Sequence, residues 1–116
     1  MEAASTMPAI APQHMQALAH ANRVRLARAE LKRGIYAGRV EAANIVRGCP
    51  WQVETMTLAE LLRSQRRWGR TRVRKLLASL QLRETRKLGQ LTDRERNLLA
   101  VALEAKLQRR AVLSGT

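Results

Sequence analysis

The chain has 116 residues, enough for one domain with a single core and too few for two. It carries 22 Lys and Arg against 9 Asp and Glu, a formal charge of +13, and nucleic acid leads among the partners of so basic a protein. Aromatic residues make up only 3%, and the single Cys excludes an internal disulfide and a multi-cysteine zinc site. This composition favours packed helices over a β-sandwich, so we expect an all-α fold.

The N-terminal third divides into two segments. Residues 1–12 are small, interrupted by prolines and poor in charge, and they predict a mobile tail. An Ala-rich helix is predicted over residues 13–34, with Gly34 as its stop. Its apolar residues scatter around the helix, so we expect it to pack over part of its length and to leave a basic end free. The basic residues of this helix are Arg23, Arg25, Arg28, Lys32 and Arg33. They fit a second DNA contact and a solvated helix face equally well.

The middle of the chain predicts three short helices. The first covers residues 39–47 and is closed by Gly48, Cys49 and Pro50, after which Trp51 is expected to anchor the core. Thr57 and Glu60 have the spacing of a capping box and open the second helix. Gly69 separates that helix from the third, which has the clearest amphipathic pattern in the chain. The predicted buried residues of these last two helices are Leu58, Leu61, Leu62, Val73, Leu76, Leu77 and Leu80.

The C-terminal third predicts a turn and a long helix. Residues 81–91 predict a turn with one short helical piece over 84–87. Thr92 and Glu95 form a second capping-box pair and open a helix that runs to about Arg109. This helix completes a domain over residues 35–110, with a tail over 111–116. Its apolar residues form two stripes, so it is either central in the core or covered by a partner, and a monomer and a weak dimer both remain open.

The positive charge is concentrated around the turn that contains Gly69. Residues 63–96 hold 12 basic residues against 3 acidic ones, a local charge of +9. Two helices joined by a glycine-containing turn form a hairpin that many nucleic-acid binders use. The amides that open the second helix suit a phosphate oxygen, and a glycine there removes the side chain that would hold the backbone away. The alternative is a solvated turn between two core helices. The residues that we predict to contact DNA here are Arg66, Arg67, Trp68, Gly69, Arg70, Arg72, Arg74 and Lys75. Trp68 could instead close the hairpin against the core.

Four segments resemble the actinobacterial integration host factor family in order and spacing. They read R-A-E-L-K at 28–32, M-T-L-A-E-L-L at 56–62, W-G-R-T-R-V at 68–73 and T-R-K-L-G-Q-L-T-D-R-E-R at 85–96. The family's turn, P-x-V-G-K, has Gln65, Trp68 and Arg70 here. Its second basic element resembles T-R-R-x-R-G-L-G. Arg86 and Lys87 match the first two cations of that element, which predicts a flanking phosphate contact, whereas Gly89 replaces the third.

The resemblance implies an all-helical protein with a helix-two-turns-helix core and a long basic N-terminal helix. It also implies a nucleoid-associated protein that binds double-stranded DNA with little sequence preference and bends or compacts it. The family also assists phage integrase-mediated recombination, so a recombinase is a further expected partner. The departures at both basic elements suggest a divergent, phage-encoded member.

Two other functions compete with DNA binding. One is a structured-RNA-binding or ribosome-associated factor, and the other is a phage regulatory adaptor that binds an acidic host protein. No acid pair, Ser-His-Asp set, phosphate loop or zinc spacing is present, so we expect no enzyme, no cofactor and no metal. No apolar run is long enough to span a bilayer and no signal sequence is recognisable, so we expect no membrane contact and a cytoplasmic location in the nucleoid.

Overall fold

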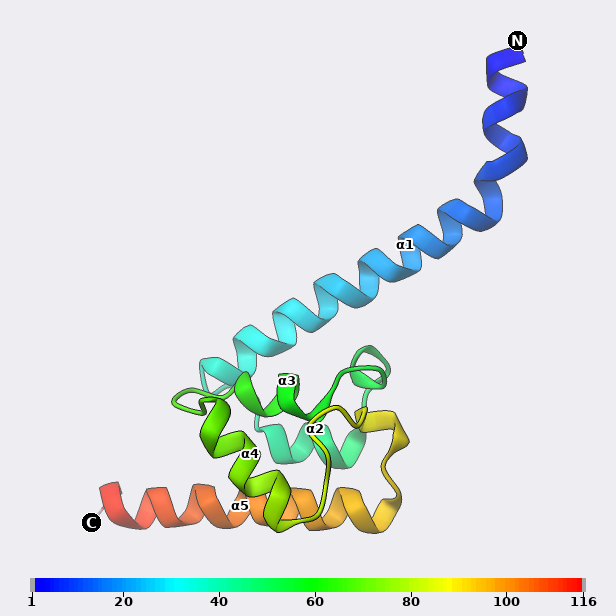
Figure 1. Cartoon of the computed structure of the whole chain (residues 1–116). Coiled ribbons are helices and arrows are strands. Elements are labelled where there is room, and N and C mark those ends of the chain that lie inside the picture. Colours follow the sequence, from blue (N-terminus) through cyan, green and yellow to red (C-terminus); the bar gives the residue numbers. More distant parts are fainter. Residues whose placement is uncertain (1, 116) are drawn as a thin grey trace.

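The structure is a computed structural model that describes the backbone of residues 2–115 and the side chains of residues 12–106 (Figure 1). Its described part is all-α, as expected, with no strand and one isolated antiparallel bridge between Thr57 and Lys87. None of its helices is long and apolar enough to cross a membrane. In chain order the elements are α1 (Glu2–Tyr36), α2 (Ala42–Gly48), the 3-10 turn η1 (Trp51–Val53), α3 (Leu58–Arg63), α4 (Arg70–Ser79), the 3-10 turn η2 (Leu88–Gln90) and α5 (Asp93–Gly115).

Helix α1 projects far beyond the rest of the molecule (Figure 1), so the whole protein is elongated and measures 71 × 28 × 24 Å along its principal axes. Only its C-terminal half joins the body, where it contacts η1, with Ile35 buried and Leu31 packed against the core. Met15, Leu18 and Leu26 are exposed. The helix therefore packs over part of its length, as expected. The basic end is the packed end, however, because Arg28 and Lys32 bond to the body.

Both ends of the predicted N-terminal helix differ from the sequence expectation. The helix begins at Glu2 rather than at residue 13, because the Ala-rich segment before residue 12 continues it. Figure 1 shows a bend in this N-terminal part, whose prolines each remove a helical hydrogen bond. At the other end, Gly34 is not the stop. It lies inside α1, where its carbonyl accepts from the amides of Arg39 and Val40, and Gly38 takes the left-handed conformation, with φ +82°.

The core lies where α2 packs against α5 and where the α3–α4 hairpin lies beside them (Figure 1). Six of the seven predicted residues of α3 and α4 are buried, and Leu80 is partly buried. Helix α5 buries Leu99, Ala100 and Leu103 and leaves Leu98 and Val101 exposed, so one of its two apolar stripes faces the core. Trp51 does not anchor the core. It is 54% exposed and its ring lies 6.4 Å from that of His20.

The two helix starts predicted from capping-box pairs are confirmed. The Oγ1 of Thr57 accepts from the amide of Glu60, and Thr92 and Glu95 exchange both bonds of a capping box. Helix α5, by contrast, runs to Gly115 and includes most of the segment predicted as a tail, because Ala111, Val112 and Leu113 do not interrupt it. The short helical piece between α4 and α5 is η2 at Leu88–Gln90, not residues 84–87.

Candidate nucleic-acid interface

The turn between α3 and α4 is held by hydrogen bonds at both of its ends. The amides of Ser64 and Gln65 donate to the carbonyls of Leu61 and Leu62, and the Gln65 side chain also donates to the Leu62 carbonyl, at 3.1 Å. The amide of Trp68 then donates to the Gln65 carbonyl. Arg67 lies between these bonds with φ +68°, a left-handed conformation that favours glycine. The turn therefore has a fixed shape before any ligand is present.

Helix α4 begins with open amides. Gly69 caps the helix in an extended conformation, φ −86°, that any residue can adopt. The first bond of the helix runs from the amide of Val73 to the Gly69 carbonyl, so the three preceding amides have no partner of the α-helical type. A Cβ placed on Gly69 would meet nothing within 4 Å. Glycine is thus not required by the backbone here, and the helix start beside it is open to solvent.

The basic residues near this start lie on two sides of it. Arg66 and Arg72 line a pocket beside the C-terminal end of α1, together with Trp68. Arg70 and Arg74 line a separate hollow beside the segment that precedes η2, and they share it with Arg63, which is not among the DNA contacts predicted from sequence. The helical spacing could have found Arg63, because it follows Leu61 and Leu62 and must point outward at the end of α3. Guanidinium groups therefore lie on both sides of the open amides.

Two of these arginines have internal partners, but weak ones. The guanidinium of Arg72 lies 4.2 Å from the centre of the Trp68 ring, in a cation–π contact, and the residue is exposed. Trp68 itself is half-buried and packs against the core, which agrees with its closing the hairpin. The Nε of Arg74 is 3.8 Å from Oε1 of Glu84, with the Arg74 side chain 64% exposed. In the side chains described, Arg66, Arg67, Arg70 and Lys75 are exposed and form no ion pair.

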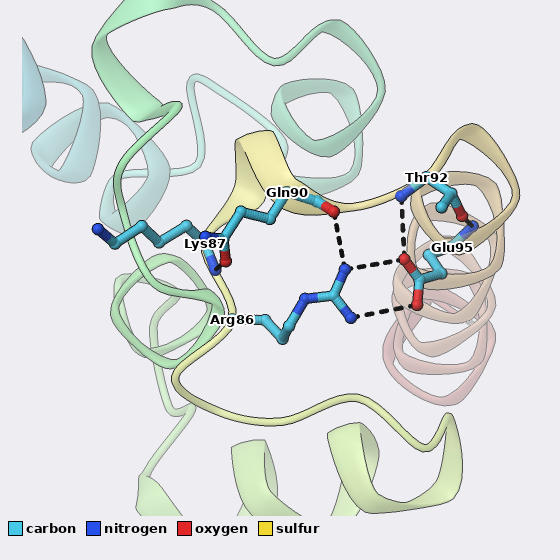
Figure 2. A network of polar contacts seen from close by, with 5 residues as sticks. All are labelled: Arg86, Lys87, Gln90, Thr92 and Glu95. Carbon is cyan, nitrogen blue, oxygen red and sulfur yellow. Dashed lines mark hydrogen bonds and ion pairs between the residues drawn. The ribbon is translucent and has the colours of Figure 1, made fainter.

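Arg86 forms the most extensive side-chain network in the described part of the chain (Figure 2). Its guanidinium donates to both carboxylate oxygens of Glu95, at 3.0 and 3.3 Å, and to the carbonyl of Gln90, at 2.8 Å. The Thr92 amide donates to the same carboxylate, and these bonds from Thr92 and Arg86 hold the pKa of Glu95 below its ordinary value. Arg86 therefore fixes the segment before α5 and is not a free cation.

Lys87 differs from Arg86 although it is the next residue. Figure 2 shows its side chain extending away from the network, and it is exposed. The bridge to Thr57 places it beside the start of α3, at the opposite end of that helix from the α3–α4 turn. Gly89 stands where the second basic element of the integration host factor family has its third cation, and the surroundings of Gly89 explain why a side chain is absent. Its amide donates to the Glu54 carbonyl, and a Cβ on it would lie 2.9 Å from that same oxygen.

The basic residues of α1 also divide into two groups, one bonded to the body, like Arg86, and one exposed, like Lys87. The Arg28 guanidinium donates to the carbonyl of Gln52, at 2.7 Å, and to the hydroxyl of Thr55, while Lys32 forms an ion pair with Glu60. These two residues attach α1 to the body. Arg23, Arg25 and Arg33 are exposed, and only Arg25 has a recorded partner, the neighbouring Asn22. Among the described residues there is no group of three or more His, Cys, Asp or Glu that could hold a metal ion.

Comparison with known proteins shows a likeness in fold. No family model matches the chain, and no curated protein does. A solved structure of sIHF, an integration host factor, bound to an 8-base-pair palindromic DNA is similar, with a TM-score of 0.66 and 20% sequence identity. The match covers 72% of this chain and 97% of the other. The two proteins therefore share a fold, in which this chain places an open helix start among exposed arginines.

Proposed function

We propose that this protein binds double-stranded DNA through phosphate contacts centred on the α3–α4 turn. The observation that carries the proposal is the open start of α4, where unpaired amides and the positive end of the helix dipole face solvent between exposed arginines. Arg66, Arg67 and Arg70 are the main contacts, because none of them is engaged elsewhere. Arg72, Arg74 and Lys75 extend the charged surface along α4.

The likeness to sIHF supports this function, because that protein is bound to DNA in its solved structure. The resemblance of four sequence segments to integration host factor supports it independently of the structure. Phosphate contacts fix position and carry no sequence information, so we propose binding with low sequence specificity. The protein would then act as a non-enzymatic architectural factor of the nucleoid, with a recombinase as a further partner.

A second contact is available on α1. Arg23, Arg25 and Arg33 are exposed on a helix that projects from the body, so one protein molecule can reach DNA outside the segment held by the turn (Figure 1). Two contacts separated in this way favour bending or compaction, because each neutralises charge on a different part of the duplex. Lys87 adds a flanking phosphate contact, and we assign Arg86 a positioning role beside it.

The test is the dependence of duplex affinity on salt, measured by fluorescence anisotropy. Neutralising about five phosphates predicts that log affinity falls with log salt at a slope of roughly −5. A duplex of unrelated sequence should give the same slope and a similar affinity. A flat response would contradict the proposal. Tighter binding to a structured RNA of equal length would instead support an RNA-binding function. Co-purification of a stoichiometric acidic protein without nucleic acid would support an adaptor.

A further inference from the structure

We propose that the pocket beside the turn binds one nucleotide, held by its planar base and by its phosphate. The pocket lies between the C-terminal end of α1, the α1–α2 loop and the α3–α4 turn, and Lys106 of α5 reaches it. The nucleotide is either free or an unpaired nucleotide of DNA, and only the second case rests on the proposed DNA binding. Most of the lining residues are outside the DNA contacts predicted from sequence, because their segments are far apart in the chain.

The pocket is formed before any ligand enters. One wall is the α1–α2 loop, which Gly38 turns with φ +82° and which two bonds to the Gly34 carbonyl fix. The opposite wall is the hydrogen-bonded α3–α4 turn. The floor is apolar, because Ile35, Ala42 and Ala43 are all buried. Its volume is 310 Å³, at the lower end of the usual range for small-ligand sites. A small ligand with a flat apolar part suits this space.

Aromatic and guanidinium groups supply the surfaces on which a base stacks. Tyr36 is 59% exposed at the end of α1 and lines the pocket, so its side chain is accessible to a ligand. Across the pocket, the Cζ of the Arg72 guanidinium lies over the Trp68 ring, 4.2 Å from the ring centre. Stacking of a base on such groups does not depend strongly on which base it is, because every base presents a π face.

The charged groups around the pocket indicate an anion. Arg66, Arg72 and Lys106 contribute three positive charges to the lining and Glu41 contributes one negative charge. Forked guanidinium groups suit phosphate oxygens, so the phosphate belongs on this side. The Glu41 carboxylate is exposed and can accept a hydrogen bond from an amino group of the base. Adenine, cytosine and guanine carry such a group, whereas thymine and uracil do not, so the first three are the preferred bases.

Trp68 provides the measurement once Trp51 is removed. The chain has two Trp residues, and Trp51 is exposed and outside the pocket, so Trp51→Phe leaves Trp68 as the single reporter. In this background we expect adenosine monophosphate to quench the fluorescence saturably, while ribose 5-phosphate, which lacks a base, has little effect. Tyr36→Ala should weaken nucleotide binding roughly tenfold, and Tyr36→Phe, which keeps the stacking surface, should change it by less than about twofold.

A second arm separates the two sources of the nucleotide. Fluorescein-labelled duplexes, one perfectly paired and one with a single unpaired adenosine, are titrated in anisotropy against the parent protein and Tyr36→Ala. If the parent protein prefers the duplex with the unpaired nucleotide and Tyr36→Ala abolishes that preference, DNA is the source. If the monophosphate quenches saturably and neither duplex is preferred, the ligand is a free nucleotide. The inference is overturned if neither occurs, or if inorganic phosphate quenches as strongly as the monophosphate. If the parent protein binds the monophosphate but does not bind the paired duplex, the proposed function is overturned and this inference stands.

Discussion

The α3–α4 turn and the segment before α5 carry similar basic residues in opposite states. Arg66 and Arg67 are exposed without an acidic partner, whereas Arg86 is bound to the Glu95 carboxylate and to a backbone carbonyl (Figure 2). The difference arises because Glu95 is held next to Arg86 by the capping bonds at the start of α5, while α4 has no acidic residue in its first turn. Basic sequence alone therefore does not define a binding surface, because a charge that is already paired costs energy to release.

The largest expected effect comes from removing the free arginines of the turn. We expect the triple variant Arg66→Ala, Arg67→Ala, Arg70→Ala to lose about 3 kcal/mol of DNA binding, or roughly 100-fold in affinity, at about 1 kcal/mol per contact. The loss should be nearly equal on unrelated duplexes, because phosphate contacts carry it. Anisotropy titrations at fixed salt measure it, and the Tm should change little because the three side chains are exposed.

A charge-matched control sharpens this result. Arg39, Arg83 and Arg94 are exposed, lie outside the turn and form no ion pair among the described side chains. Replacing these three with Ala removes the same net charge. If both triple variants lose affinity equally, general electrostatic attraction explains the binding and the turn has no special role.

Single substitutions of Arg86 and Lys87 should separate an effect on fold stability from an effect on DNA binding. Arg86→Ala leaves the Gln90 carbonyl and the Glu95 carboxylate without their shared donor, so we expect the Tm to fall by several degrees. Lys87→Ala should leave the Tm unchanged and reduce the magnitude of the salt slope by about 1, because one phosphate contact is lost. Thermal melts and salt titrations of both variants provide the measurements. If Arg86→Ala instead reduces the salt slope and Lys87→Ala lowers the Tm, then Arg86, not Lys87, is the DNA contact.

Local sequence patterns predicted the hairpin well because they act over a few residues. Helical spacing identified Leu61, Leu62 and Val73 as buried, and both capping-box threonines accept the expected bonds. The ends of α1 and α5 were harder to predict. Alanine-rich and leucine-rich segments continue a helix without any local stop, and Gly34 is tolerated inside α1.

The parts of the site that sequence could not predict depend on contacts between distant residues. Arg28 and Arg86 are indistinguishable from free arginines in the sequence, and only the fold brings Gln52 and Glu95 to them. The same holds for the nucleotide pocket, in which Tyr36 and Lys106 face one space. Trp51 is the opposite kind of error, because the sequence predicted a contact that the fold does not make. This large apolar residue next to a helix start lies at the surface.

The pH dependence of fold stability tests the contribution of the Glu95 carboxylate to the Arg86 network. Bonds from Thr92 and Arg86 hold the pKa of Glu95 below its ordinary value of 4.5. The ionised carboxyl therefore contributes its full stability above about pH 4.5, and this contribution is lost as the pH falls through the lower pKa of the folded state. We expect Glu95→Gln to be less stable than the parent at pH 7 and to lose less stability on acidification.

Denaturant titrations at several pH values measure this effect. Some decline should remain in Glu95→Gln, because Arg47 lowers the pKa of Glu104 in the same direction. Glu30→Gln is the matched control, since Glu30 is an exposed carboxyl on α1. An acid profile of Glu95→Gln that is parallel to the parent's would exclude a contribution from the network.

The smallest expected effect concerns two residues with positive φ. Gln81, after α4, has φ +59° and Arg67, in the turn, has φ +68°. Glycine relieves this strain but gains entropy in the unfolded chain, so we expect Gln81→Gly to stabilise the fold by about 0.5 kcal/mol without changing DNA affinity. Arg67→Gly should give the same gain in stability and weaken DNA binding. If it instead leaves binding intact, the turn keeps an arginine in a strained position for a reason other than phosphate contact. Denaturation midpoints and anisotropy on the two variants decide between these outcomes.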